Sequence, residues 1–188
     1  VAALSITNDA HALTAAGFGA IASLVDERRG YSALTALNFT ANGLQSKATK
    51  ALAKALRENC SVAHLCLDCN PIGDKAIAAL ARALARNRSI TSLSLANCAL
   101  TPGGAGALAT ALSSASVLTS LDVSRNFLDS DGGDGGGDAA AHQLAAMQCS
   151  TLQRLVMREC GVGDAGLTSL AGWMQSGIDR VELGECPR

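Results

Sequence analysis

The sequence contains few aromatic residues: three Phe, one Tyr and one Trp among 188 residues. Aromatic rings therefore cannot dominate a core, and Ala and Leu must fill it through close packing of neighbouring elements. We expect the core positions of strands and helices to have no room for a ring. Charged residues are also scarce at 16%, but a hydrophobic content of 48% is too high for a disordered chain.

The chain has no excess of positive charge, since 15 Lys and Arg face 16 Asp and Glu for a net charge of −1. Binding nucleic acid or an anionic membrane requires cations that neutralise phosphates, so we expect neither partner. No apolar run approaches the roughly 20 residues of a membrane span, and residues 1–10 lack the basic start of a signal peptide. These features favour a cytoplasmic protein, with the cytoskeleton or cilium as a candidate location.

One pattern, LxxLxLxx(N/C)x(L/I), recurs along the chain. The three intervals between its first four full copies are all 28 residues, and intervals of 34 and 26 follow. Equal spacing of this kind indicates a repeat architecture. Five full copies and two weaker ones begin at Leu34, Val62, Ile90, Leu118, Leu152, Val1 and Ile178.

Each copy predicts one short strand followed by one helix. In the helix predicted from Gly73, Ile77, Leu80 and Leu84 recur at helical spacing. A unit of this size cannot bury its apolar side alone, whereas stacked copies can. We therefore predict an α/β leucine-rich-repeat solenoid, an arc with a parallel β-sheet on the concave face and α-helices on the convex face. Candidate helix N-caps follow each strand turn at Ser46, Asp74, Thr101 before Pro102, and Asp164.

The segment NPIGDKAIAALARALARNRSITSLSL, from Asn70, resembles the ribonuclease-inhibitor subclass of leucine-rich repeats, with its 28-residue unit. The resemblance covers nearly the whole chain, from Leu4 to Cys186. It implies a horseshoe or arc that many unrelated binders use, among them ribonuclease inhibitor, immune-receptor sensor arms, the GTPase-activating protein for Ran and axonemal subunits. It therefore implies a fold and not one function.

We expect one leucine-rich-repeat domain over residues 1–188, with about six repeats and a partial one, as a fragment of a longer chain. Residues 129–138 form a Gly/Asp-rich loop insertion in which we expect Asp138 to cap the next helix. The acidic spacing of this loop does not match a calcium-binding hand. Near the other end, Trp173 replaces a helix alanine and is expected to fill space beside a shortened junction. The last repeat lacks a helix, so we expect further chain or a partner to cover that edge.

Seven cysteines without regular spacing argue against a secreted disulfide scaffold and favour a reducing compartment. Cys98, Cys160 and Cys186 occupy the repeat position that Asn42, Asn70 and Asn126 fill in other copies. This position turns inward after the strand, so we predict that its side chains are buried and that the thiols are unreactive.

The pair Cys66 and Cys69 has the CxxC spacing of metal or redox sites. His64, Cys66 and Asp68 alternate along one predicted strand, so all three should face the concave surface. A metal ion or a Cys–His pair is conceivable there. Ordinary variation on an exposed strand face is the simpler interpretation, and we predict no metal and no cofactor.

Two arginine-bearing repeats distinguish the C-terminal end of the predicted concave face. Arg154, Arg158 and Arg180 alternate with buried positions there, and Val156 is also expected to face the concave surface. The arginines are suited to hold a partner's carboxylate by forked hydrogen bonds. Alternatively, acidic neighbours hold them within the surface. The residues predicted to contact a protein partner are Asp122, Arg154, Arg158, Arg180, Glu182, His64 and Asp68.

The sequence shows no convincing catalytic site. Three His occur, and none lies in a known nucleophile or metalloprotease motif. We therefore predict a non-catalytic protein–protein interaction scaffold, a subunit or arm of a larger cytoskeletal or axonemal assembly, without a small-molecule substrate. The alternative is a regulator of an enzyme, such as a GTPase-activating or inhibitor-type protein. The concave face and the array ends are the expected contact surfaces, with a merely solvated concave face as the simpler alternative.

Overall fold

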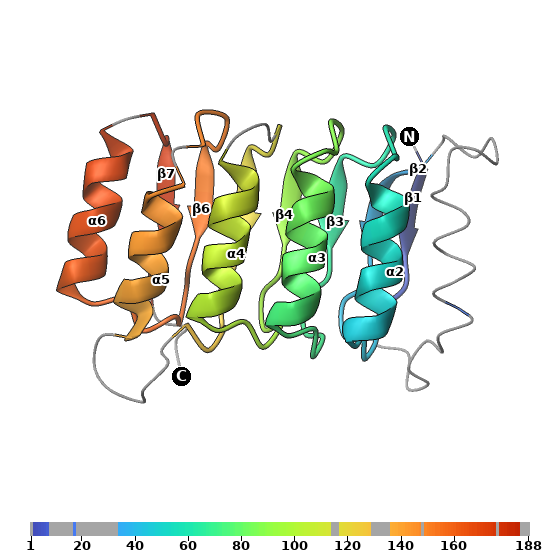
Figure 1. The fold of residues 1–188 in the computed structure, drawn as a ribbon, viewed down its shortest axis with the longest axis horizontal. Helices are drawn as coiled ribbons and strands as arrows, with labels where there is room; N and C mark the ends of the chain where they lie inside the picture. Colours follow the sequence, from blue (N-terminus) through green and yellow to red (C-terminus); the bar gives the residue numbers. More distant parts are fainter. Residues whose placement is uncertain are drawn as a thin grey trace.

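A computed structural model describes residues 2–7, 17, 34–113, 117–128, 136–147, 149–175 and 177–184. Strands and helices alternate along this part of the chain (Figure 1). The elements are β1 (Ala2–Ser5), β2 (Leu34–Asn38), α2 (Ser46–Leu56), β3 (His64–Cys66), α3 (Asp74–Leu84), β4 (Ser92–Ser94), α4 (Pro102–Leu112), β5 (Ser120–Asp122), α5 (Gly136–Ala145), β6 (Arg154–Val156), α6 (Asp164–Met174) and β7 (Arg180–Glu182).

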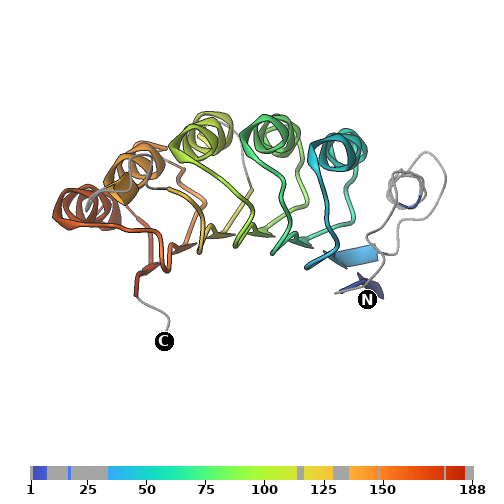
Figure 2. The same cartoon turned by 90° about the horizontal axis from the view of Figure 1, so that it is seen from below.

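The seven strands form one parallel sheet in chain order, and the helices lie side by side along its other face (Figure 2). Equivalent residues of successive repeats pair across the sheet, as Leu65 pairs with Leu93 and Leu93 with Leu121. Even the weak first copy joins, because Ala3 pairs with Ala36 after an irregularity between Ala2 and Ala3. The predicted α/β solenoid is confirmed, and the core lies between the sheet and the helices.

The helices begin close to the predicted positions, with one correction. Ser46, Asp74 and Asp164 are the first helical residues and not the caps, because the non-helical residue before each one, Gln45, Gly73 or Gly163, is at the cap position. Thr101 is an N-cap as predicted. Its side chain accepts a hydrogen bond from the backbone N–H of Gly103, with Pro102 as the first helical residue.

The expectation that the core has no room for a ring is wrong. Phe39 is fully buried in the strand-end position that Leu67 and Leu95 fill elsewhere, and Trp173 is buried as well. Trp173 lies in the last turn of α6, whose connection to β7 has five residues, whereas the connections that follow α2, α3 and α4 have seven. The prediction that Trp173 fills space beside a shortened junction agrees with this burial.

The inward turn position is confirmed for the residues that the structure describes. Asn70 donates to the carbonyls of Phe39 and Leu67, and its Oδ1 accepts from the backbone N–H groups of Asn42 and Leu44. Three of these four hydrogen bonds, those with Phe39, Asn42 and Leu44, join Asn70 to the preceding repeat. Asn126 repeats this arrangement two repeats further on.

Where cysteine replaces asparagine at this position, the side chain makes fewer hydrogen bonds, because a thiol lacks the acceptor oxygen of the amide. The Cys98 thiol donates to the carbonyl of Leu67 at 3.2 Å, and the Cys160 thiol donates to that of Val123 at 3.3 Å. Burial raises the pKa of the Cys98 thiol to about 12 and that of the Cys160 thiol to about 11. Both thiols are therefore neutral at physiological pH. Cys186 lies outside the described residues.

The Gly/Asp-rich insertion is described only from residue 136, so Asp129, Asp131 and Asp134 lie outside the described part. Helix α5 begins at Gly136, and Asp138 therefore lies within its first turn instead of at its N-cap. The Asp138 carboxylate accepts hydrogen bonds from the backbone N–H groups of Gly163 and Gly166 in the next repeat. Asp138 thus caps a neighbouring helix and not its own. None of the described helices combines the length and apolar composition needed to cross a bilayer.

Candidate functional site on the concave face

The strands place the predicted contact residues on two rungs of the concave face. One rung runs through Ser120, Arg154 and Arg180, and the next runs through Asp122, Val156 and Glu182. Adjacent parallel strands are about 4.8 Å apart, so residues on neighbouring strands can share partners. The three arginines and Glu182 are therefore brought together by sheet register although they lie up to 28 residues apart.

Glu182 lies at the centre of this group, which we call the Arg cluster: Arg154, Arg158, Arg180 and Glu182. Arg154 and Arg180 approach Glu182 Oε1 at 2.8 and 3.0 Å, and Arg158 approaches Oε2 at 2.6 Å. The Glu182 side chain is 9% exposed, whereas the three arginine side chains are 46%, 56% and 68% exposed. The carboxylate is enclosed by guanidinium groups that keep a face toward solvent.

The electrostatics of the Arg cluster follow from this geometry. The hydrogen bond from Arg154 is the main cause that lowers the pKa of the Glu182 carboxyl below its usual range, and Arg158 and Arg180 add to it. Glu182 is therefore ionised at neutral pH. One negative charge is shared among three positive charges, so the cluster has surplus positive charge and unused N–H donors for a further anion.

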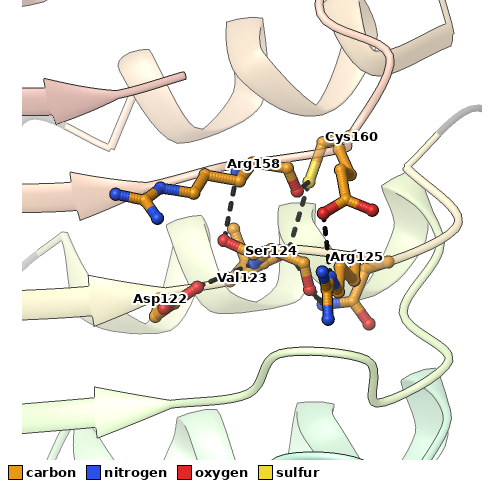
Figure 3. Close-up of polar contacts among 8 residues, drawn as sticks. Asp122, Val123, Ser124, Arg125, Arg158 and Cys160 are labelled. Atoms are coloured by element: carbon orange, nitrogen blue, oxygen red, sulfur yellow. Dashed lines mark hydrogen bonds and ion pairs between the residues drawn. The ribbon is translucent and has the colours of Figure 1, made fainter. Parts of the chain in front are cut away.

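The acidic residue on the neighbouring strand has a different role. Asp122 Oδ1 accepts from the backbone N–H of Ser124, and the Ser124 hydroxyl accepts from the backbone N–H of Arg158 (Figure 3). The sequence placed two carboxylates, Asp122 and Glu182, beside the arginines. Only Glu182 forms ion pairs with them among the described residues. Asp122 supports the turn that follows its own strand.

Val156 is buried, which corrects the expectation that it faces solvent. It lies between Asp122 and Glu182 on its rung and between Arg154 and Arg158 along its strand. Three of these neighbours, Arg154, Arg158 and Glu182, are longer than valine and are joined to one another by ion pairs. The surface available to a partner is therefore made of the arginines and not of an apolar strand centre.

A cavity of about 430 Å³ opens beside the Arg cluster. Arg125 and Glu159 line it together with Arg154 and Arg158, and they form an ion pair of 2.9 Å with each other. Both occur at positive φ, 57° and 54°, directly before the inward-turning residues Asn126 and Cys160. Sequence reasoning missed this pair. The signal was its fixed place one residue before the inward position in neighbouring repeats.

His64 and Asp68 do not join the Arg cluster, because three strand spacings of roughly 4.8 Å separate β3 from β6. Asp68 Oδ1 accepts hydrogen bonds from the Ser94 hydroxyl at 2.6 Å and from the backbone N–H of Ala96 at 2.9 Å. Its carboxylate therefore links two repeats, and His64 remains exposed beside it.

Cys66 of β3 lies between His64 and Asp68 along the chain, and its thiol contacts the side chains of Asp68 and Thr40. Its thiol donates to Asp68 Oδ2 and lies 3.2 Å from the Thr40 hydroxyl. Burial is the main cause that raises the pKa of the Cys66 thiol. Within the described residues, no group of three His, Cys, Asp or Glu has the geometry to hold a metal ion.

The C-terminal edge of the described array exposes apolar side chains. Leu167 and Met174 of α6 are 44% and 45% exposed. At the equivalent positions of α3, Ile77 and Leu84 are 0% and 3% exposed, because α4 packs against them. The predicted apolar edge is therefore present on α6.

Three segments of the chain, residues 58–81, 86–109 and 148–171, match the family described as Leucine Rich repeat. Together with the parallel sheet and outer helices, these matches define a leucine-rich-repeat solenoid. Comparison with curated proteins finds no match. Among solved structures, the chain is similar to "Leiomodin-1 Actin-Binding Site 2 (ABS2)", with a TM-score of 0.57 and 21% identity over 70% of this chain and 73% of that chain. That likeness concerns the fold.

Proposed function

We propose that the chain is a non-catalytic protein-interaction module that binds a protein partner through its concave face. The observation that carries this proposal is the Arg cluster: three exposed guanidinium groups held within 3.0 Å of one carboxylate. Arginine is enriched at the energetic centres of protein interfaces, and an arginine already held in place loses less side-chain freedom on binding. Leucine-rich repeats and a fold shared with an actin-binding fragment support a binding role.

The partner chemistry that fits the Arg cluster is a protein segment that carries a carboxylate. Glu182 orients the guanidinium groups, and a partner carboxylate would bind the donors that face the 430 Å³ cavity. The smaller side chains of β3 to β5 would let the rest of the partner approach the sheet, with His64 and Asp68 as its more distant contacts. The apolar edge of α6 is a second contact surface for a larger assembly.

We also propose that the repeats are of the ribonuclease-inhibitor subclass, because consecutive copies are spaced by 28 residues. A cytoskeletal assembly is the proposed setting. The similar leiomodin-1 fragment is an actin-binding site of that protein, which makes actin filaments the first partner to test. The reducing compartment inferred from the cysteine pattern agrees with this setting.

Co-sedimentation with actin filaments tests the proposal. We expect wild-type protein to pellet with filaments and Arg158→Glu to bind them at least about tenfold more weakly. The melting temperature should not change, because the Arg158 side chain is exposed. Lys75→Glu, an exposed position on α3 away from the concave face, is the charge-reversal control and should bind as wild type. Equal binding by Arg158→Glu would refute the concave-face assignment. No pelleting of the wild type would refute actin as the partner.

A further inference from the structure

The cations of this chain are concentrated on two neighbouring helices. All four Lys and four of the 11 Arg lie between residues 47 and 88, and only three acidic residues lie in the same span. One of the three, Asp68, is on the concave side of the sheet. The overall charge of −1 therefore conceals a basic convex surface. Its cations are Lys47, Lys50, Lys54, Arg57, Lys75, Arg82, Arg86 and Arg88.

The spacing of these residues places them in stripes along the helices. On α2 they recur every three or four residues, so one helix face carries them while Leu52 and Leu56 are buried on the opposite face. Arg82 on α3 and Arg86 just beyond its end are likewise exposed. Because α2 and α3 pack side by side, the two stripes run along the same convex surface (Figures 1 and 2).

A groove of about 430 Å³ lies between the two stripes, and we call it the α2–α3 groove. Its floor is made of the short side chains of Ala53, Ala79 and Ala83. Its lining residues span seven steps along each helix direction, 50–57 and 79–86, which corresponds to about 11 Å. All of its longer side chains are positively charged. They are Lys50 and Lys54 of α2 with Arg57 directly after it, and Arg82 of α3 with Arg86 two residues beyond its end.

The fold itself does not require these cations. At the positions of α4 that correspond to Lys50 and Lys54, the chain has Gly106 and Thr110, and α6 has Thr168 and Gly172. Those helices pack in the same way without a charge there. In the part of the chain that the structure describes, Arg57 is the one groove cation with an ion pair, to Glu58 at 2.8 Å. Among the described residues, the other four groove cations have no carboxylate oxygen within 4.0 Å.

We propose that the α2–α3 groove binds an acidic segment of a partner protein. Nucleic acid fits less well, because single strands bind through aromatic stacking as well as charge, and no aromatic side chain lines the groove. A membrane surface fits less well, because lasting attachment needs an apolar anchor beside the charges. The exposed large hydrophobic side chains of the described residues, Phe127, Leu167 and Met174, all lie outside α2 and α3.

The α2–α3 groove is a different surface from the Arg cluster, because the helices and the sheet's concave side face opposite directions (Figure 2). The recognition also differs. The Arg cluster has its guanidinium groups fixed around Glu182, whereas the groove has flexible cations on both rims of an apolar floor. The groove thus suits several successive carboxylates, as in a run of Glu or Asp, and its binding should be strongly salt-dependent.

The experiment measures binding of a fluorescent peptide of about 12 residues, mostly Glu, by fluorescence anisotropy at two salt concentrations. The groove variant combines Lys50→Gln, Lys54→Gln, Arg82→Gln and Arg86→Gln. The concave variant combines Arg154→Gln and Arg158→Gln. All six side chains are exposed, so both variants should keep the wild-type melting temperature. An uncharged peptide of equal length, a poly-dT oligonucleotide and vesicles with anionic lipid are the comparison probes.

We expect the groove variant to bind the acidic peptide at least about tenfold more weakly than wild-type protein does. The concave variant should lose less affinity, because the Arg cluster offers donors to a partner carboxylate but has no row of cations that a run of Glu could follow. Raising the salt concentration should also weaken binding of the acidic peptide to the wild-type protein, because salt screens the charges of the groove. Equal binding by the groove variant, or loss only in the concave variant, would overturn the proposal. Tighter groove-dependent binding of poly-dT or of vesicles would overturn the choice of an acidic protein segment. None of these outcomes decides the actin experiment, which depends on Arg158.

Discussion

Asp138 of α5 accepts a hydrogen bond of 2.7 Å from the backbone N–H of Gly163, the residue that precedes α6. The same oxygen accepts from Gly166 within α6 at 2.9 Å. Asp74 of α3 makes a related bond to the backbone N–H of Thr101 before α4. The carboxylate of one repeat thus satisfies the helix start of the next, which couples neighbouring repeats at their helix ends.

Asp138→Ala should lower the free energy of unfolding by about 1–2 kcal/mol, because it leaves helix N–H groups without an acceptor. Asp164→Ala is the matched control. Asp164 has the equivalent place on α6, and among the described residues its side chain accepts no such bond. The control should change stability by less than about 0.5 kcal/mol. Urea denaturation measures both values, and equal losses would contradict the capping role of Asp138.

Asn70→Ala should cost about 1–3 kcal/mol of stability, because it orphans buried groups in two repeats. Asn70→Cys should cost less, since a thiol at this position donates to the preceding repeat as Cys98 does. Denaturant unfolding of the two variants checks the order. An alanine variant as stable as wild type would show that these hydrogen bonds contribute nothing net.

The buried thiols of Cys98 and Cys160 predict that the stability of the fold decreases at alkaline pH. The pKa is raised to about 12 for Cys98 and about 11 for Cys160, against about 8.5 in an unfolded chain. The unfolded state therefore loses these protons first. Stability present below about pH 8.5 should fall as pH rises toward 11. The free energy of unfolding should differ less between pH 7.5 and pH 10 in the double variant Cys98→Ala, Cys160→Ala than in the wild-type protein.

The same burial predicts selective reactivity among the cysteines. Cys69 is exposed, whereas Cys98 and Cys160 are buried. A thiol reagent at pH 8 should modify Cys69 well before either buried thiol, as mapped by mass spectrometry of the native protein. Modification of Cys98 at the same rate as Cys69 would be inconsistent with the inward position.

Glu182 predicts an acid transition of the Arg cluster. The pKa of the Glu182 carboxyl lies below the usual value of about 4.3. The stability that the ionised carboxylate contributes is therefore present above about pH 4.3 and is lost as the pH falls through the lowered pKa. NMR titration of the Glu182 carboxyl should show this low pKa, and Arg154→Gln should raise it toward the usual value. A titration unchanged by Arg154→Gln would refute the assigned contact. The change in overall stability should stay small, because the arginines are exposed.

Much of the fold could be predicted because each repeat carries its own local signals. The phase of Leu65, Leu93 and Leu121 predicts both the strands and their register, since equivalent residues stack in a solenoid. A second periodic signal went unnoticed. Asn59 and Asn87 are spaced by 28, are buried, and hold the turn before the next strand. Cys149 has the same place in a later repeat, again as a replacement for Asn.

The candidate site was predicted less completely. Alternation along the strands placed the arginines on the concave face, but Asp122 and Glu182 were equal candidates to hold them. The choice depends on side-chain length and reach across strands, and the longer Glu182 is the one that meets all three guanidinium groups. Burial of Val156 follows from the same crowding, which no pattern along one strand reveals.

The sequence by itself determined the repeat, the parallel sheet, the inward Asn and Cys positions and the composition of each face, because local periodicity dictates these features in a stacked array. Tertiary structure alone decided which distant side chains meet. Asp138 caps a later helix, Phe39 and Trp173 enter the core, Glu182 gathers three arginines, and two basic helices enclose one groove. Each of these depends on distances and free volume between repeats, which are set only when neighbouring repeats pack.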